Sequence, residues 1–85
     1  MHTREARADD AATIVDFNAR MALETEGLTL DSAVLARGVA QALADPNKGR
    51  YLIAEADGAR VGQLMFTTEW SDWRNGWFWW IQSVY

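Results

Sequence analysis

The sequence predicts one α+β domain with the element order β-α-α-β-β-β and a mainly antiparallel sheet. Apolar residues recur at helical spacing in two segments of the first half, whereas the second half changes to the period of two that is typical of strands. The dipeptide Asp57-Gly58 gives a strong hairpin signal between two of these strands, so they are expected to pair antiparallel. The 85 residues are enough for one small domain, residues 1–85, with no internal repeat.

The chain begins with a predicted short strand and a helix. Residues 3–7 are assigned to the strand, although few of them are apolar. The helix is expected over residues 10–24 and ends near Gly27, because apolar side chains recur there every three or four positions. Asp9 and Asp10 stand at its start, where carboxylates stabilise the free N–H groups and the helix dipole. The main apolar positions are Ile14, Phe17 and Met21.

A second helix is expected from Asp31, which is a favourable N-cap residue. Pro46 ends this helix, and residues 46–49 form a turn. The helix therefore has the length of an ordinary globular helix with one apolar stripe. The stripe consists of Val34, Leu35, Val39, Ala42 and Leu43.

Three strands are expected after the turn. Residues 51–56 and 60–70 form the two arms of a hairpin. A polar loop over residues 71–76 leads into a last strand at residues 77–85, which is rich in residues of high β-propensity. Consecutive strands joined by short turns predict an antiparallel meander.

The last strand is predicted to be apolar on both faces. Residues 70–85 contain seven of the ten aromatic residues, so both faces are expected to be buried, although two helices can cover only one. Its outer edge also lacks a partner strand, so we expect it to pair with a second copy or with a complementing chain. Strict alternation assigns Trp77, Trp79, Ile81, Ser83 and Tyr85 to one face, and Phe78, Trp80, Gln82 and Val84 to the other.

Composition excludes several classes of function. The net charge is −4 and no basic cluster is present, which argues against binding to nucleic acid. The absence of cysteine excludes disulfides, and no group of residues has the spacing of a metal site. The N-terminus lacks the apolar segment of a signal peptide, and no apolar run approaches the length of a membrane span. A cytoplasmic protein without a membrane partner is therefore expected.

Three segments of the sequence resemble the N-terminal half of a GCN5-related N-acetyltransferase (GNAT). Residues 4–14 resemble the first strand and the Asp-rich helix entry of that family, and residues 51–62 resemble its next hairpin, in which Val-Gly precedes an apolar strand. Residues 81–85 resemble the V-x-V end of its fourth strand. The resemblance covers residues 3–85 and implies the first half of an acyl-CoA N-acyltransferase fold.

The resemblance implies acetyl-CoA as co-substrate. In this family the pantetheine arm pairs with the backbone at the end of the fourth strand, which here means Val84 and Tyr85. The pyrophosphate is bound by a following R/Q-x-x-G-x-G/A loop at a helix N-terminus. The 85 residues end before such a loop, so this chain alone is expected to be inactive and the full-length protein to be an N-acetyltransferase.

By the same resemblance, the acceptor is a primary amine of a small molecule. Family members commonly place a Glu on the fourth strand to take up the amine proton. The aligned positions hold Trp80 and Gln82, so no catalytic residue is assigned. Gln82 and Ser83, the polar residues of this strand, are expected either to contact the substrate or to make hydrogen bonds within the sheet.

Two further pairs of residues are candidates for the acceptor site. Glu24 and Glu26 stand at the end of the first helix, a region that lines the acceptor site in relatives; the alternative is a solvated helix end. Trp70 and Trp73 flank the polar loop and either line an acceptor pocket or remain on the surface.

A second hypothesis requires no catalysis. The aromatic last strand would make the chain an interaction or dimerisation module that pairs with another polypeptide. A platform of tryptophans for carbohydrate is a third hypothesis, which the two helices disfavour.

Overall fold

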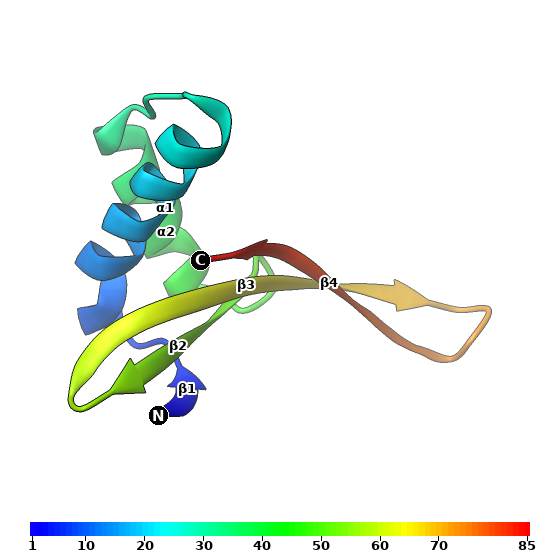
Figure 1. Cartoon of the computed structure of the whole chain (residues 1–85). Coiled ribbons are helices and arrows are strands. Elements are labelled where there is room, and N and C mark those ends of the chain that lie inside the picture. The colour runs from blue at the N-terminus through cyan, green and yellow to red at the C-terminus, as the bar shows by residue number, and fades with distance from the viewer.

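The computed structural model describes all residues, Met1–Tyr85, and forms one four-stranded antiparallel sheet with two helices on one face (Figure 1). The strand order is β1-β2-β3-β4, so every strand pairs with its neighbour in sequence. The predicted fold class and element order are therefore confirmed, with one additional 3₁₀ turn, η1. The elements are β1 (His2–Glu5), η1 (Ala8–Asp10), α1 (Ala11–Glu26), α2 (Ser32–Ala44), β2 (Arg50–Ala56), β3 (Ala59–Ser71) and β4 (Gly76–Val84).

The core lies between the helices and the first part of the sheet. Ile14 of α1, Val39 of α2 and Ile53 of β2 are buried against one another, together with Tyr51. Met65 of β3 packs on this cluster from the same face of the sheet. The helices therefore cover β2 and the adjoining part of β3, and the far end of the β3–β4 hairpin extends beyond them (Figure 1).

The helix ends follow the chemistry of their residues. Gly27 ends α1 with a φ of 66°, a left-handed conformation that glycine adopts without strain. The Asp31 carboxylate accepts hydrogen bonds from the N–H groups of Ala33 at 3.0 Å and Val34 at 3.1 Å, which caps α2 as predicted.

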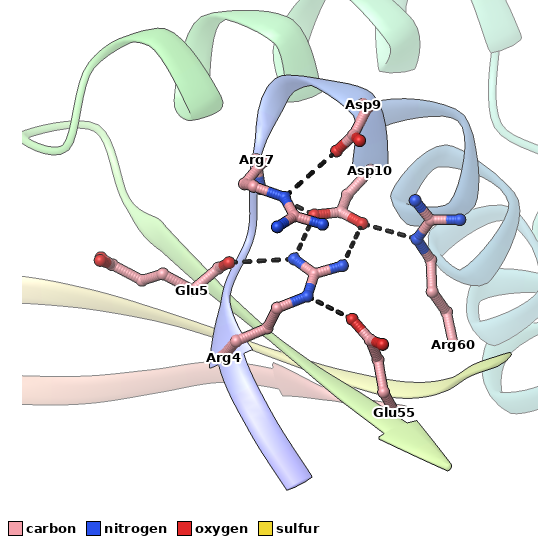
Figure 2. Close-up of polar contacts among 7 residues, drawn as sticks. All are labelled: Arg4, Glu5, Arg7, Asp9, Asp10, Glu55 and Arg60. Carbon is pink, nitrogen blue, oxygen red and sulfur yellow. Dashed lines mark hydrogen bonds and ion pairs between the residues drawn. The ribbon is translucent and has the colours of Figure 1, made fainter. Parts of the chain in front are cut away.

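Asp10 stands at the N-cap position of α1 as predicted, but its side chain makes no cap hydrogen bond to that helix. It accepts one from the N–H of Arg7 at 2.7 Å, in a capping box at the start of η1. Arg4 holds both carboxylate oxygens of Asp10 from β1, at 2.7 and 2.9 Å, and Arg60 donates to one of them from β3 at 2.6 Å (Figure 2). Arg4 also pairs with Glu55 of β2. The buried carboxylate therefore joins both edges of the β1–β2–β3 unit to the start of α1, and these two arginines lower its pKa well below the usual range.

The prediction that both faces of the last strand are buried is wrong for this chain. Trp77, Trp79, Trp80 and Ile81 of β4 are all exposed. The helices lie over β2 and the adjoining part of β3 and leave the hairpin end of β4 uncovered. No element of the chain covers the opposite face of the sheet (Figure 1). Because β4 is also an edge strand, one row of its backbone groups has no partner strand.

The predicted strict alternation along β4 fails at Gln82. Ser83 lies opposite Met65 and Ile81 lies opposite Phe66, so Gln82 is an extra residue without a partner in β3. This β-bulge reverses the side-chain alternation beyond it. Ser83 and Tyr85 therefore face the helices, and not the bare face that carries Trp79 and Ile81.

No helix is both long enough and apolar enough to cross a membrane. The structure also holds no group of three or more His, Cys, Asp or Glu side chains that could bind a metal ion.

Candidate functional site

An open pocket of about 300 Å³ lies where α1 and α2 meet the bulge of β4. It brings together three residues that the sequence analysis proposed as substrate contacts, namely Glu26, Gln82 and Ser83. The helix layer and the sheet both contribute to the pocket: α1 and α2 form one wall, and β4 forms the other. The remaining lining residues are Asn18, Met21, Ala22, Thr25, Leu30 and Leu35.

The bulge explains how two adjacent residues line one pocket. Neighbouring side chains of a regular strand point to opposite faces, so Gln82 and Ser83 would be separated by the sheet without it. The Gln82 side chain donates to the Thr67 hydroxyl of β3 at 2.8 Å, which holds it on the helix-bearing face. Its amide oxygen remains available to accept a hydrogen bond from a ligand.

Glu26 is the one charged side chain that lines this pocket. Asn18, Thr25, Gln82 and Ser83 add amide and hydroxyl groups to the lining. Apolar side chains form the rest of the lining. A carboxylate without a cationic partner in a partly apolar pocket attracts an ammonium group and repels an anion. The lining therefore suits an amine that carries both a positive charge and an apolar portion.

Buried polar side chains lie directly beneath the pocket. Asn18, which lines it, donates to the Tyr51 hydroxyl at 3.2 Å and accepts from the Gln63 side chain at 3.1 Å. Gln63 is almost fully buried, and its side-chain oxygen has no hydrogen-bond partner. Since three side chains from α1, β2 and β3 fix one another, Asn18 is held in a defined orientation beside the pocket.

Glu24 lies outside the pocket, close to the Tyr85 hydroxyl. The nearby Glu24 carboxylate raises the pKa of Tyr85. The Tyr85 ring also packs against Phe17 of α1, with the ring centroids 5.2 Å apart. The structure thus gives Glu24 and Tyr85 a shared role in joining the end of β4 to α1.

The two residues proposed to bind the cofactor, Val84 and Tyr85, direct their backbone groups to different sides of β4. Tyr85 donates to the Gln63 carbonyl at 2.8 Å and accepts from the Gln63 N–H at 3.0 Å. Adjacent residues of an antiparallel strand direct their backbone groups to opposite sides, so those of Val84 point to the open edge. Val84 therefore keeps backbone groups available for a ligand, whereas those of Tyr85 are already paired within the sheet.

Trp70 and Trp73 lie apart from the pocket. Trp70 is opposite Trp77 near the tip of the β3–β4 hairpin, and their rings pack edge to face with centroids 5.2 Å apart. Trp73 in the turn is 96 % exposed. The five steps along the strand from Trp77 to Gln82 span roughly 16 Å, so the pair does not line the same site as Gln82.

Sequence reasoning missed two residues of this region, Asn18 and Gln63. Asn18 lies beside the apolar stripe of the first helix. A polar side chain in that position, together with a Gln inside an otherwise apolar strand, is the signal that could have identified the pair. Their proximity depends on how α1 docks on β3, which the spacing of residues along the chain does not determine.

A second hollow, of about 170 Å³, lies between the end of α2 and the start of β2. Its charged residues, Glu5 and Arg50, form an ion pair with each other. None of the residues proposed from the sequence lines this hollow, so the pocket beside the bulge is the better candidate site.

We predict that Gly62→Ala displaces the end of β4. A Cβ at Gly62 would lie 2.9 Å from the Tyr85 carbonyl oxygen, so the backbone must shift and we expect a loss of about 1–3 kcal/mol in the free energy of unfolding. Gly38→Ala is the matched control, because a Cβ there meets nothing within 4 Å and alanine favours a helix by about 1 kcal/mol. Urea titrations and hydrogen exchange at the Tyr85 amide measure both variants. Stabilisation by both substitutions would contradict the close approach.

Comparison with known proteins relates this fold to acetyltransferases. The chain is 54 % identical to a protein described as a possible acetyltransferase from Clostridium difficile 630, with a TM-score of 0.96 over 99 % of this chain and 55 % of that one. A probable acetyltransferase, at 14 % identity, has a TM-score of 0.88 over 100 % of this chain and 56 % of its own. An integron cassette protein from the mobile metagenome of Cole Harbour Salt Marsh, at 20 % identity, has a TM-score of 0.87 over 98 % and 54 %.

The two more distant structures show similarity of fold alone. The chain spans about half the length of each of the three structures that it matches. No protein-family model and no curated protein sequence matches it.

Proposed function

The chain forms part of a GNAT-like acetyltransferase fold, and we propose that it supplies the acceptor-binding half of an enzyme that transfers acetyl from acetyl-CoA to a primary amine of a small molecule. The observation that carries the proposal is the 54 % identity to a possible acetyltransferase over 99 % of this chain. The matched region includes the helices and the strand that line the pocket.

The pocket beside the bulge is the proposed acceptor site. Glu26 would attract the ammonium form of the amine, and the Gln82 amide and Ser83 hydroxyl would orient it through hydrogen bonds. The apolar side chains of α1 and α2 would contact the rest of the molecule. The amine must lose a proton before it attacks the acetyl group, and no side chain here is assigned as the base.

The edge of β4 is the proposed site for the arm of acetyl-CoA. The outward backbone groups of Val84 fit an amide-containing arm that lies along the strand, and Val84 is two residues from Gln82 in the pocket. The cofactor would supply an acetyl thioester to the amine at this junction. The chain holds no glycine-rich segment at a helix N-terminus to receive phosphate groups, so we propose that it does not acetylate amines by itself.

A chimera tests the proposal. This chain replaces the matching segment of the Clostridium difficile relative, and acetyl-CoA consumption is measured against a panel of small amines, with the unaltered relative alongside. We expect acetylation of cationic amines that have an apolar portion. A chimera that folds and binds acetyl-CoA but acetylates none of the amines used by the relative would contradict the assignment.

Glu26→Gln in that chimera tests the electrostatic role of the pocket. Loss of a partly exposed charge pair of about 1 kcal/mol should raise KM for a cationic amine about fivefold and leave kcat nearly unchanged. Asp16→Asn on the same helix is the control, because its carboxylate is paired with Arg20 and does not line the pocket. Equal effects of the two substitutions would exclude a specific role for Glu26.

Calorimetry of the 85-residue chain with acetyl-CoA completes the test. We expect no binding in the micromolar range, because the residues present offer a strand edge without a phosphate site. Micromolar affinity would show that the chain alone binds the cofactor.

A further inference from the structure

The side chain of Asn18 keeps hydrogen-bonding groups that the fold does not use. A side-chain amide offers two N–H donors and two lone pairs on its oxygen. In Asn18 one N–H donates to the Tyr51 hydroxyl at 3.2 Å, and the oxygen accepts from the Gln63 side chain at 3.1 Å. The other N–H and the other lone pair remain free, on a side chain that lines the pocket beside the bulge.

Gln63 is a buried polar residue whose presence the fold alone does not explain. Its side chain is 4 % exposed, and its amide oxygen has no hydrogen-bond partner. Such an atom destabilises a fold, whereas an apolar side chain of the same size would fill the site without that penalty. The glutamine supplies one thing that an apolar residue lacks, which is the hydrogen bond to Asn18. Its role therefore lies in the orientation of Asn18.

The pocket has a charged end and a neutral end. Glu26 and Asn18 both line it from α1, and their backbone positions lie roughly 12 Å apart along the helix axis. Because the two side chains differ in charge, they select different chemical groups. A ligand that contacts both has an ammonium group at one end and a neutral polar group at the other.

We propose that Asn18 is a further acceptor-site residue, which selects amines that carry a neutral hydrogen-bonding group a few carbon atoms from the nitrogen. Its free N–H and lone pair match a group that both donates and accepts, namely a hydroxyl or a carboxamide. Gln63 and Tyr51 do not line the pocket and act through Asn18, as positioning residues. This inference rests on the proposed acetyl transfer at this pocket and narrows the class of acceptor.

Three amines of matched length test the selection in the chimera with the Clostridium difficile relative. They are propanolamine, β-alaninamide and butylamine, which end in a hydroxyl, a carboxamide and a methyl group. Asn18→Ala should raise KM for the preferred polar amine about tenfold, with kcat nearly unchanged, because that amine loses a hydrogen-bonding partner. KM for butylamine should stay within about twofold, since its methyl group had no such partner. The polar amine with the larger change identifies the group that the site takes.

Gln63→Met and Tyr51→Phe test the positioning role. Each removes one of the hydrogen bonds that hold Asn18 and leaves the lining of the pocket as it is. Each should raise KM for the preferred polar amine about threefold and add nothing to Asn18→Ala in a double variant, because coupled groups are not additive. Gln41→Met is the matched control, since it makes the same change at an exposed residue of α2 outside the pocket. Urea titration shows whether each variant folds, and Tyr51→Phe keeps the test available if Gln63→Met does not.

Side-chain NMR of the 85-residue chain tests the same residues without catalysis. The Asn18 side-chain N–H protons should exchange slowly with water, and Gln63→Met and Tyr51→Phe should each accelerate that exchange. Millimolar propanolamine or β-alaninamide should shift the Asn18 side-chain signals, and butylamine should shift them less. Unchanged exchange in both variants would overturn the positioning role.

The outcomes distinguish this inference from the proposed function. If the chimera acetylates the amines and Asn18→Ala changes KM equally for all three, the inference is wrong and the function stands. If the chimera is inactive but a polar amine shifts the Asn18 signals of the chain, acetyl transfer is contradicted and the site is supported. Absence of both acetylation and shifts would overturn both.

Discussion

Asp10→Asn is expected to lower the free energy of unfolding by about 3 kcal/mol, the cost of breaking a buried ion pair from one side. The substitution keeps the shape of the side chain but leaves Arg4 and Arg60 without their shared carboxylate. The lower end of the range applies because both guanidinium groups retain some contact with solvent. Asp9→Asn is the control, since Asp9 is exposed and pairs only with exposed Arg7. Urea titrations of both variants measure the effect.

The pH dependence of the same variant gives a second measurement. The two arginines lower the pKa of Asp10 in the folded chain, so its contribution to stability is present above the pKa of an unfolded Asp, near 4, and is lost as the pH falls toward the folded pKa. Between pH 5 and pH 3 the stability difference between the natural chain and Asp10→Asn should shrink by about 1 kcal/mol. A constant or growing difference would show that Asp10 stabilises the fold by some means other than its charge.

Ile53→Ala is expected to cost about 3 kcal/mol, within the range for removing a buried isoleucine. Ile53 is inaccessible to solvent and lies between the sheet and both helices. Only nine of the 85 residues are buried, so little packing exists elsewhere to compensate for the cavity. A domain of this size has a total stability on the order of 4–13 kcal/mol, so the change removes a large fraction of it.

Ile53→Val and Val61→Ala calibrate this prediction. The first removes one methylene from the same site and should cost about 1 kcal/mol, and the second shortens an exposed side chain on β3 and should cost less than about 0.5 kcal/mol. Equilibrium unfolding in urea gives all three values. An Ile53→Ala effect no larger than that of Val61→Ala would mean that this cluster is not the core of the folded chain.

The secondary structure could be predicted because each element has a local cause. Asp31 caps α2, Gly27 ends α1, and Asp57-Gly58 adopts the two positive φ angles, 53° and 77°, of a tight hairpin. These signals act within a few residues of sequence. The order of strands then follows, since short turns join neighbours.

The two main errors have non-local causes. Asp10 stands at a helix start, as a capping residue would, but its partners Arg4 and Arg60 come from two strands that are brought together only by the fold. The facing of Ser83 depends on a bulge at Gln82, and no glycine or proline marks it in the sequence. The contacts of Asp10 and the facing of Ser83 both depend on how strands pair in the folded sheet. The spacing of residues along the chain does not reveal that pairing.

Some residues of the candidate site could be predicted from the sequence, and others could not, because the site depends on contacts between distant elements. Glu26, Gln82 and Ser83 line one pocket, because the end of α1 and the end of β4 meet on the helix-bearing face. Trp70 and Trp73 were judged by their nearness in sequence to a polar loop, and the length of the hairpin carries that loop away from the helices (Figure 1). Residues of a long strand share a face without sharing a site.

The extra residue at Gln82 has a consequence for how this chain can change over evolution. Loops tolerate insertions and deletions of any length, but in a paired strand the partner strand determines which side each residue faces. Deleting Gln82, which has no partner in β3, would leave Ser83 opposite Met65 and Tyr85 paired with Gln63, so both would still face the helices and Tyr85 would keep its contact with Phe17. The deletion would instead remove the Gln82 side chain and its hydrogen bond to Thr67 from the pocket. We therefore expect descendants that lose this residue to keep the fold and to change the pocket.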